Sequence, residues 1–214
     1  FVLDYLLTRV EVEVWKYCAN YPNLFSDKLL LMLDSVELMM LKDTKTKSFF
    51  AFKNGILEVD KNQYKLVDYI DVNGYVWESQ IIQRDWISLE EYQNEYMTFI
   101  NNVSNGEPLP IECSIGYLLS TYKNKMNNKA IILNDEVINQ NPEGGTGKGL
   151  FVQGLRQIRK VSILDGKTFD DKKSFPYQTV SPETQVLVFD DVLKNFNFEN
   201  KFSLVTEGMT LERK

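Results

Sequence analysis

Glycines and a single lysine are concentrated in residues 142–149, which read Pro-Glu-Gly-Gly-Thr-Gly-Lys-Gly. An apolar run precedes this stretch, and apolar residues at helical spacing follow it. A strand, a glycine-rich turn and a helix together form the context of a phosphate-binding loop. Glycines let backbone N–H groups converge on an anion, and the helix N-terminus adds a partial positive charge. The residues expected to surround the phosphates are Glu143, Gly144, Gly145, Thr146, Gly147, Lys148 and Gly149.

The stretch departs at two positions from the full phosphate-loop pattern G-x-x-x-x-G-K-[ST]. Pro142 stands where the first glycine is expected. Gly149 stands where a Ser or Thr hydroxyl usually binds Mg²⁺. A surface loop with a solvated lysine is therefore the alternative interpretation of this stretch.

A second pattern, residues 186–191, has four apolar residues followed by Asp190 and Asp191. It predicts a buried parallel strand with carboxylates at its C-terminal end, where ligands bind in open α/β sheets. We expect Asp190 to hold Mg²⁺, and Asp191 to orient or deprotonate the attacking water. The alternative is an apolar strand that ends in a solvated acidic turn. Both patterns, in the expected order and about 40 residues apart, predict a nucleoside triphosphatase with Lys148, Asp190 and Asp191 as catalytic residues.

Composition excludes several kinds of site. The 214 residues contain no histidine and two cysteines, which argues against zinc fingers and histidine-based acid–base chemistry. We expect Cys18 and Cys113 to be small core residues in a reducing compartment. The net charge of −6 argues against a surface that is basic all over. No apolar run approaches the roughly 20 residues of a membrane span.

The first half of the chain predicts helices and a small β-rich insert. Helical spacing indicates helices over residues 1–19, from Ser26 onward and over 111–122. Strand-like runs surround Asn54-Gly55, a hairpin signal. The polar run 42–47 is expected to be a turn or an exposed edge. Ser88-Leu89-Glu90-Glu91 is a capping box, and the helix after it carries an aromatic stripe that we interpret as core rather than as a base-stacking surface.

The second half alternates between strands and helices. We predict strands over 129–134, 161–165 and 185–190, and helices over 148–160 and about 195–207. Such alternation implies a parallel sheet. Positive residues near the end of the first of these helices, Arg156, Arg159 and Lys160, suit a helix C-terminus, and we favour this interpretation over a DNA contact.

Three further segments carry a family resemblance. Residues 202–214 resemble the segment that follows the Walker B acids in superfamily 3 helicases of phages, plasmids and DNA viruses. Residues 52–58 are similar to the "F-x-N-G-hydrophobic" strand that precedes the ATPase in phage and poxvirus-type primase-helicases. Residues 115–119 are similar to the helix that leads into their ATPase core. The resemblance spans residues 48–214.

The resemblance implies an α/β fold with an AAA+-like P-loop NTPase core built on a parallel sheet, preceded by a smaller α+β domain. The expected divisions are an N-terminal helical segment over 1–47, the α+β domain over 48–122 and the ATPase core over 123–214. Residues 143–149 would form Walker A, and Asp190 and Asp191 Walker B. Arg213 and Lys214 would lie on a DNA-binding hairpin.

The family's cofactors are ATP and Mg²⁺, and its partners are single-stranded or forked DNA and identical subunits in a hexameric ring. The resemblance implies a role in bacteriophage or mobile-element DNA replication in the bacterial cytoplasm, with no membrane partner. The chain has no initiator Met and stops before the family's sensor strand and arginine finger. We therefore expect a C-terminally incomplete core that is weakly active or inactive by itself.

Two other functions remain alternatives to a helicase. Gly149 and Pro142 favour a degenerate P-loop that binds nucleotide as a scaffold or loader without hydrolysis, whereas the paired acids argue against it. A P-loop enzyme of another class, such as a kinase, is disfavoured by the segment after Asp191. Stimulation of ATP hydrolysis by single-stranded DNA would separate the three.

Overall fold

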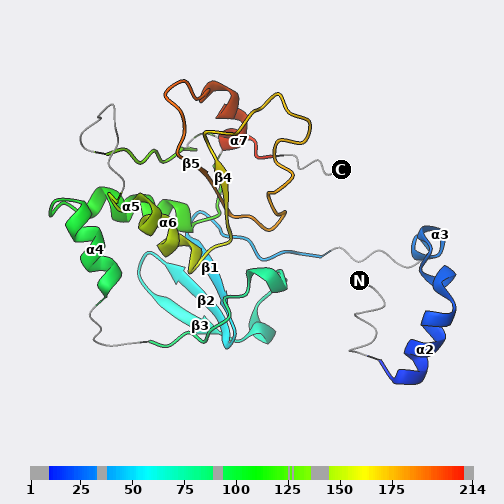
Figure 1. The fold of residues 1–214 in the computed structure, drawn as a ribbon. Coiled ribbons are helices and arrows are strands. Elements are labelled where there is room, and N and C mark those ends of the chain that lie inside the picture. Colours follow the sequence, from blue (N-terminus) through cyan, green and yellow to red (C-terminus); the bar gives the residue numbers. More distant parts are fainter. Residues whose placement is uncertain are drawn as a thin grey trace. The chain divides into compact units, whose positions relative to one another are not determined.

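The computed structural model describes residues 10–32, 38–88, 94–124, 126, 128–135 and 145–209. Contacts divide the chain into two compact units, 1–38 and 39–214. Figure 1 shows the elements of both units, which form a mixed α/β structure. Within the described residues, no helix is both long enough and apolar enough to cross a membrane.

The first unit contains α2 (Val12–Asn20), a 3₁₀ helix over Pro22–Phe25 and the short α3 (Asp27–Leu30). Pro22 begins the 3₁₀ helix, which confirms the predicted break after the first helix. Residues 1–9 and 33–37, which belong to the two predicted helices, lie outside the described residues.

The predicted β-rich insert is confirmed as a three-stranded antiparallel sheet. Its strands β1 (Lys47–Phe52), β2 (Gly55–Asp60) and β3 (Tyr64–Val67) pair in the order β1-β2-β3. Gly55 has a φ of 147°, and a Cβ at this position would lie 2.7 Å from the carbonyl oxygen of Val67. A glycine is therefore required at the turn between β1 and β2.

Residues 81–86 run along the edge of this sheet. Ile82 donates its N–H to the carbonyl of Ala51 at 2.8 Å, and Lys53 donates to the carbonyl of Arg84 at 3.2 Å. The Asn54 side chain accepts a hydrogen bond from the Trp86 N–H at 2.8 Å and donates one to the Trp86 carbonyl at 3.0 Å. These bonds hold the 81–86 segment against β1.

Three helices pack together in the same unit: α4 (Glu95–Val103), α5 (Leu109–Leu119) and α6 (Lys148–Arg156). Their buried centre consists of Ile100, Phe151 and Leu155. This core joins residues on both sides of the predicted 122/123 division, which itself stays a prediction.

The start of α4 differs from expectation. Asn94 is the N-cap, and its side chain accepts hydrogen bonds from the N–H groups of Tyr96 and Met97. The predicted capping box at Ser88 therefore does not cap this helix, because asparagine offers the same oxygen acceptor closer to the helical residues. Leu89, Glu90 and Glu91 lie outside the described residues.

Glycines of α6 make room for the aromatic stripe of α4. A Cβ on Gly154 would lie 2.3 Å from the Tyr96 ring, and one on Gly147 would lie 2.8 Å from the Phe99 ring. The Tyr96 hydroxyl also donates to the carbonyl of Phe151 at 3.1 Å. Tyr96 and Phe99 pack against the helical core, which confirms the core interpretation for these two rings.

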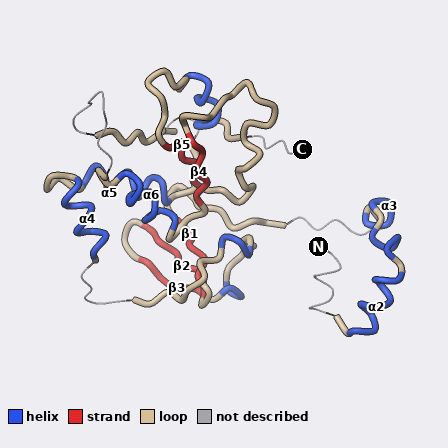
Figure 2. The backbone as a smooth tube through the Cα atoms, in the orientation of Figure 1, coloured by secondary structure: helices blue, strands red, loops and turns tan. Residues whose placement is uncertain are grey.

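A two-stranded parallel sheet completes the unit. Its strands β4 (Val161–Asp165) and β5 (Val186–Asp190) pair in register from Val161–Val186 to Asp165–Asp190. Both strands were predicted and are confirmed. The connection between them, residues 166–185, contains neither helix nor strand (Figure 2).

The predicted strand over 129–134 is wrong, because residues 128–135 form neither strand nor helix. Ile132 remains 60% exposed, and within the described part of the chain this run pairs with neither β4 nor β5. Apolar residues alone do not make a strand when no neighbouring strand completes the hydrogen-bond ladder.

The predicted helix over 195–207 is shorter than expected. Only a 3₁₀ helix over Glu199–Lys201 and α7 (Phe202–Thr206) form. Phe196 packs instead on Phe189, with ring centroids 5.3 Å apart, and on Phe198, at 5.1 Å. Tertiary ring packing thus replaces the first half of the predicted helix.

Cys113 is exposed, which corrects the expectation that it is a core residue. It lies on the solvent face of α5, while Cys18 is half-buried in the first unit. Both are free thiols.

Candidate functional site

Helix α6 begins directly after the glycine-rich stretch, as an anion-binding loop requires. Gly147 is the N-cap of α6, with φ 92° and ψ −5°, and Lys148 is the first helical residue. Among the described residues no side chain caps this helix, so the N–H groups of its first turn can bind a ligand. Gly145 also has a positive φ, 96°. Glu143 and Gly144 lie outside the described residues.

Two glycines of this loop are uncrowded by the described residues. A Cβ added at Gly145 or Gly149 would meet none of the described atoms within 4 Å. Packing against the described residues therefore does not require glycine at these two positions. Gly145 needs its positive φ, whereas Gly149 lies within the regular helix and has no such need.

Lys148 contacts two side chains of its own loop region. Its Nζ forms an ion pair with the carboxylate of Asp135 and donates to the Thr146 hydroxyl at 2.9 Å. The hydrogen bonds from Lys148 and then from Thr146 lower the pKa of Asp135. The Lys148 side chain keeps 40% of its surface exposed. Lys148 is therefore accessible to a bound phosphate, which would compete with Asp135 for the lysine ammonium group.

Sequence reasoning missed Asp135. It directly follows residues 129–134, which the sequence predicts to be a strand, so an acid at the end of that segment is the available signal. The same signal had been used for Asp190 and Asp191.

The two predicted catalytic acids differ in their surroundings. Asp190 is the last residue of β5, and its exposed carboxylate makes no ion pair or hydrogen bond with any described residue. Asp191 has a φ of 52°, and its carboxylate forms an ion pair with Lys167 Nζ at 2.9 Å. This bond raises the pKa of Lys167. Asp190 is thus free to bind a cation, while Asp191 already has a partner.

The carboxyl ends of β4 and β5 are tightly joined. Gly166 donates its N–H to the carbonyl of Asp190 at 2.6 Å, and a Cβ on Gly166 would lie 2.7 Å from that oxygen. Asp165, opposite Asp190, accepts from the Thr168 hydroxyl and from the N–H of Lys167, which lowers its pKa. Asp165, Asp190 and Asp191 therefore lie at two adjacent strand ends.

The N-terminus of α6 lies against α4, where a Cβ on Gly147 would come within 2.8 Å of the Phe99 ring. Residues 157–160 connect α6 to β4 and contact the antiparallel sheet through Arg159, which donates to the Phe49 carbonyl at 3.0 Å. From that point α6 runs back toward its N-terminus and β4 runs forward to its carboxyl end (Figure 1). Lys148 does not contact Asp190 or Asp191 directly; its partners are Asp135 and Thr146.

Arg159 has a structural role that the sequence did not reveal. Its guanidinium pairs with Asp43 at 2.8 Å and donates to the Leu119 carbonyl at 2.7 Å. It also lies over the Phe50 ring at 4.2 Å. Burial lowers the pKa of Arg159, an effect partly offset by the Asp43 carboxylate. Asp43, expected in an exposed run, is instead buried with only 3% of its side chain accessible, because this arginine compensates its charge.

The donor set fits Mg²⁺ and a nucleotide in chemical type. Mg²⁺ is commonly held by one or two carboxylates together with phosphate oxygens and waters, and Asp190 offers one free carboxylate. The uncapped α6 N-terminus, Lys148 and two positive-φ glycines offer phosphate ligands. The predicted DNA-binding residues Arg213 and Lys214 lie outside the described residues.

Comparisons of the chain with protein-family models, with curated proteins and with solved structures find no match. A functional assignment therefore rests on these residues and their geometry.

Proposed function

We propose that the chain binds ATP and Mg²⁺ at the N-terminus of α6 and belongs to an ATP-driven DNA helicase. The observation that carries this proposal is the start of α6, where left-handed Gly147 precedes Lys148 and no described side chain caps the first-turn N–H groups. The parallel strands β4 and β5 support it, because their acids lie at the carboxyl ends of the strands, where ligands bind in open α/β sheets.

The side chains divide the work at this site. Lys148 and the backbone N–H groups of the first turn bind phosphate oxygens, which requires Lys148 to leave Asp135. Asp190 holds the cation through its free carboxylate. Asp191 orients or deprotonates the attacking water once Lys167 has released it. When bound, Mg²⁺ supplies charge neutralisation at the phosphates.

The helicase part of the proposal draws on the resemblance of residues 48–214 to phage and plasmid primase-helicases. It assigns ATP hydrolysis at the interfaces of a hexameric P-loop ring, with movement along single-stranded or forked DNA during replication in a bacterial cytoplasm. Arg213 and Lys214 would contact the strand. The confirmed hairpin at Asn54-Gly55 and the confirmed helix α5 are consistent with this assignment.

A nucleotide-binding scaffold or loader without hydrolysis is the second candidate. Two contacts favour it: Lys148 is held by Asp135, and Asp191 is held by Lys167. Gly149 also lacks the hydroxyl that commonly binds Mg²⁺. In this alternative the site binds nucleotide but does not reach the arrangement needed for turnover.

The deciding experiment measures ATP binding by titration calorimetry and phosphate release with and without single-stranded DNA. DNA-stimulated hydrolysis supports the helicase. ATP binding without hydrolysis supports the scaffold. Absence of ATP binding contradicts both.

A further inference from the structure

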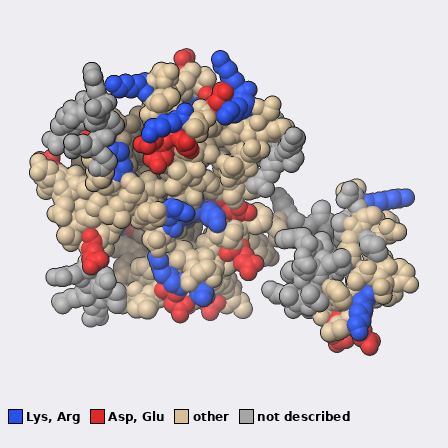
Figure 3. Space-filling view, in the orientation of Figure 1, with Lys and Arg blue, Asp and Glu red and all other residues tan. Residues whose placement is uncertain are grey.

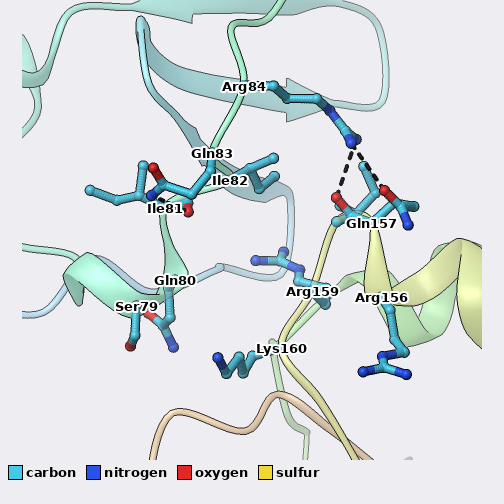
Figure 4. Close-up of a pocket in the computed structure, with 11 residues that line it drawn as sticks. Ser79, Gln80, Ile81, Ile82, Gln83, Arg84, Arg156, Gln157, Arg159 and Lys160 are labelled. Atoms are coloured by element: carbon cyan, nitrogen blue, oxygen red, sulfur yellow. Dashed lines mark hydrogen bonds between the residues drawn. The ribbon is translucent and has the colours of Figure 1, made fainter.

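A basic cleft lies at the opposite end of α6 from the proposed ATP site. It has a volume of about 370 Å³ and opens between residues 79–84 and residues 156–160 (Figure 4). One wall follows the edge of the antiparallel sheet, and the other is the end of α6 with its connection to β4.

Positive side chains from both walls line this cleft. They are Arg84, Arg156, Arg159 and Lys160, and no Asp or Glu lies among the described residues of its lining. Asp43 compensates the charge of Arg159, which leaves Arg84, Arg156 and Lys160 as exposed cations. Figure 3 shows Lys and Arg side chains together in the middle of this face. The local charge is thus opposite in sign to the net charge of −6.

Hydrogen bonds hold the two walls together. Arg84 donates from both terminal nitrogens to Gln157, to its side-chain and backbone oxygens, each at 3.2 Å. Gln80 donates to the carbonyl of Glu183 at 3.3 Å, and the Gln185 side chain accepts from the N–H of Lys160 at 3.1 Å. In Figure 4 the side chains of Lys160 and Gln80 point toward one another across the cleft. The cleft is therefore preformed.

Helix electrostatics account for only part of this charge. Arg156 lies in the last turn of α6, where a cation interacts favourably with the helix dipole. Arg84 belongs to a different segment, so the dipole of α6 does not explain its presence. The described residues provide no acid that pairs with Arg156 or Lys160.

We infer that this cleft binds the phosphodiester backbone of a single nucleic-acid strand. Two arginines, a lysine and the amide donors of glutamine match phosphate oxygens, which accept hydrogen bonds and carry negative charge. The cleft volume of about 370 Å³ is far too small to enclose a duplex. The inference is independent of ATP binding, and it places the strand at a site other than the expected hairpin at Arg213 and Lys214.

The test measures binding of the full chain to fluorescently labelled oligothymidine by anisotropy over a range of salt concentrations. In the cleft variant, Arg156→Gln with Lys160→Gln, we expect affinity to fall roughly tenfold and the salt slope to fall by about 1.4, because two phosphate contacts are lost. A matched variant, Lys173→Gln with Lys194→Gln, changes net charge equally outside the cleft and should bind as wild type. Arg156→Lys with Lys160→Arg should retain binding.

Three outcomes would overturn the inference. The cleft and matched variants could lose affinity equally, which would indicate only a net-charge effect. Polyglutamate could compete as well as oligothymidine, which would indicate a general polyanion surface. ATP affinity could fall in the cleft variant while oligothymidine binding stays unchanged, which would identify a free nucleotide as the ligand. Circular dichroism of each variant verifies folding.

Discussion

Arg159 and Asp43, 116 residues apart in the chain, form a buried ion pair at 2.8 Å. The pair joins the end of α6 to the segment before β1, and Asp43 also accepts from the N–H groups of Phe49 and Thr121, both at 2.8 Å. It thereby fixes the antiparallel sheet, α5 and the start of β4 around one point. The candidate sites at the two ends of α6 depend on this anchor for their positions.

Replacing Asp43 with Asn should destabilise the protein by about 3–5 kcal/mol, because it leaves the buried Arg159 guanidinium without a counter-charge. The free energy of unfolding from denaturant titration measures this effect. Glu58→Gln is the matched control. It breaks exposed pairs with Lys47 and Lys65 and should cost less than about 1 kcal/mol. Equal losses in the two variants would contradict a structural role for the buried pair.

Local sequence patterns correctly predicted the elements that are stabilised by interactions between residues close together in sequence. The Asn54-Gly55 hairpin, α5 and the start of α6 at Lys148 are of this kind. β4 and β5 were also predicted, because continuous apolar runs typify buried parallel strands. These elements account for the correct part of the fold prediction.

The remaining features depend on partners far away in the sequence. The sequence predicted an exposed Asp43, but Asp43 is buried because the distant Arg159 supplies its counter-charge. The apolar run 129–134 indicated a strand, but it finds no pairing partner among the described residues. At the candidate site, Lys148 was identified from its loop, whereas its partner Asp135 was missed, because no local pattern reports which acid a lysine contacts.

Gly149→Ser should strengthen Mg²⁺-dependent ATP binding. A Cβ at this position meets no described atom within 4 Å, and a serine hydroxyl would supply the cation ligand that the loop lacks. Stability should rise by up to about 0.5 kcal/mol, because serine is a better helix residue than glycine. Titration calorimetry with ATP, with Mg²⁺ and with EDTA, isolates the metal-dependent part.

Gly147→Ala is the contrasting substitution in the same loop. The φ of 92° and the Phe99 ring at 2.8 Å both oppose a Cβ, so we expect a loss of about 1–3 kcal/mol in unfolding free energy. If Gly147→Ala were as stable as Gly149→Ser, the described start of α6 would be incorrect.

Lys148→Ala should abolish tight ATP binding and leave the fold intact. The side chain is 40% exposed, and its Nζ bonds only to Asp135 and Thr146 among the described residues, so its charge is not part of the core. Loss of a charged phosphate contact costs about 1.5–3 kcal/mol of binding. Calorimetric ATP affinity and the thermal unfolding midpoint, measured together, distinguish a binding defect from unfolding; unchanged affinity would remove the phosphate-loop interpretation.

Asp135→Asn should have the opposite effect on ATP affinity, because it removes the carboxylate that competes with phosphate for Lys148. Hydrogen bonds from Lys148 and Thr146 lower the pKa of Asp135 from its usual 3.8. The carboxylate therefore stays charged, and its competition persists, from neutral to mildly acidic pH. The affinity gain over wild type should be present across that pH range. A loss of affinity would instead mean that Asp135 positions Lys148 for the ligand.

Asp190→Asn and Asp191→Asn should affect different steps. The Asp190 carboxylate is exposed at the end of β5 and free of described partners, so its loss should weaken ATP binding with Mg²⁺ and leave metal-free binding unchanged. The Asp191 carboxylate pairs with Lys167, and its residue has a φ of 52°, so it is directed differently from its neighbour. Asp191→Asn should retain binding and reduce hydrolysis in the DNA-stimulated assay.

Lys167→Met is the control that releases Asp191 without removing it, and it should preserve or raise turnover. If both Asp variants hydrolyse ATP at the wild-type rate, neither acid is catalytic and the scaffold function becomes the better explanation.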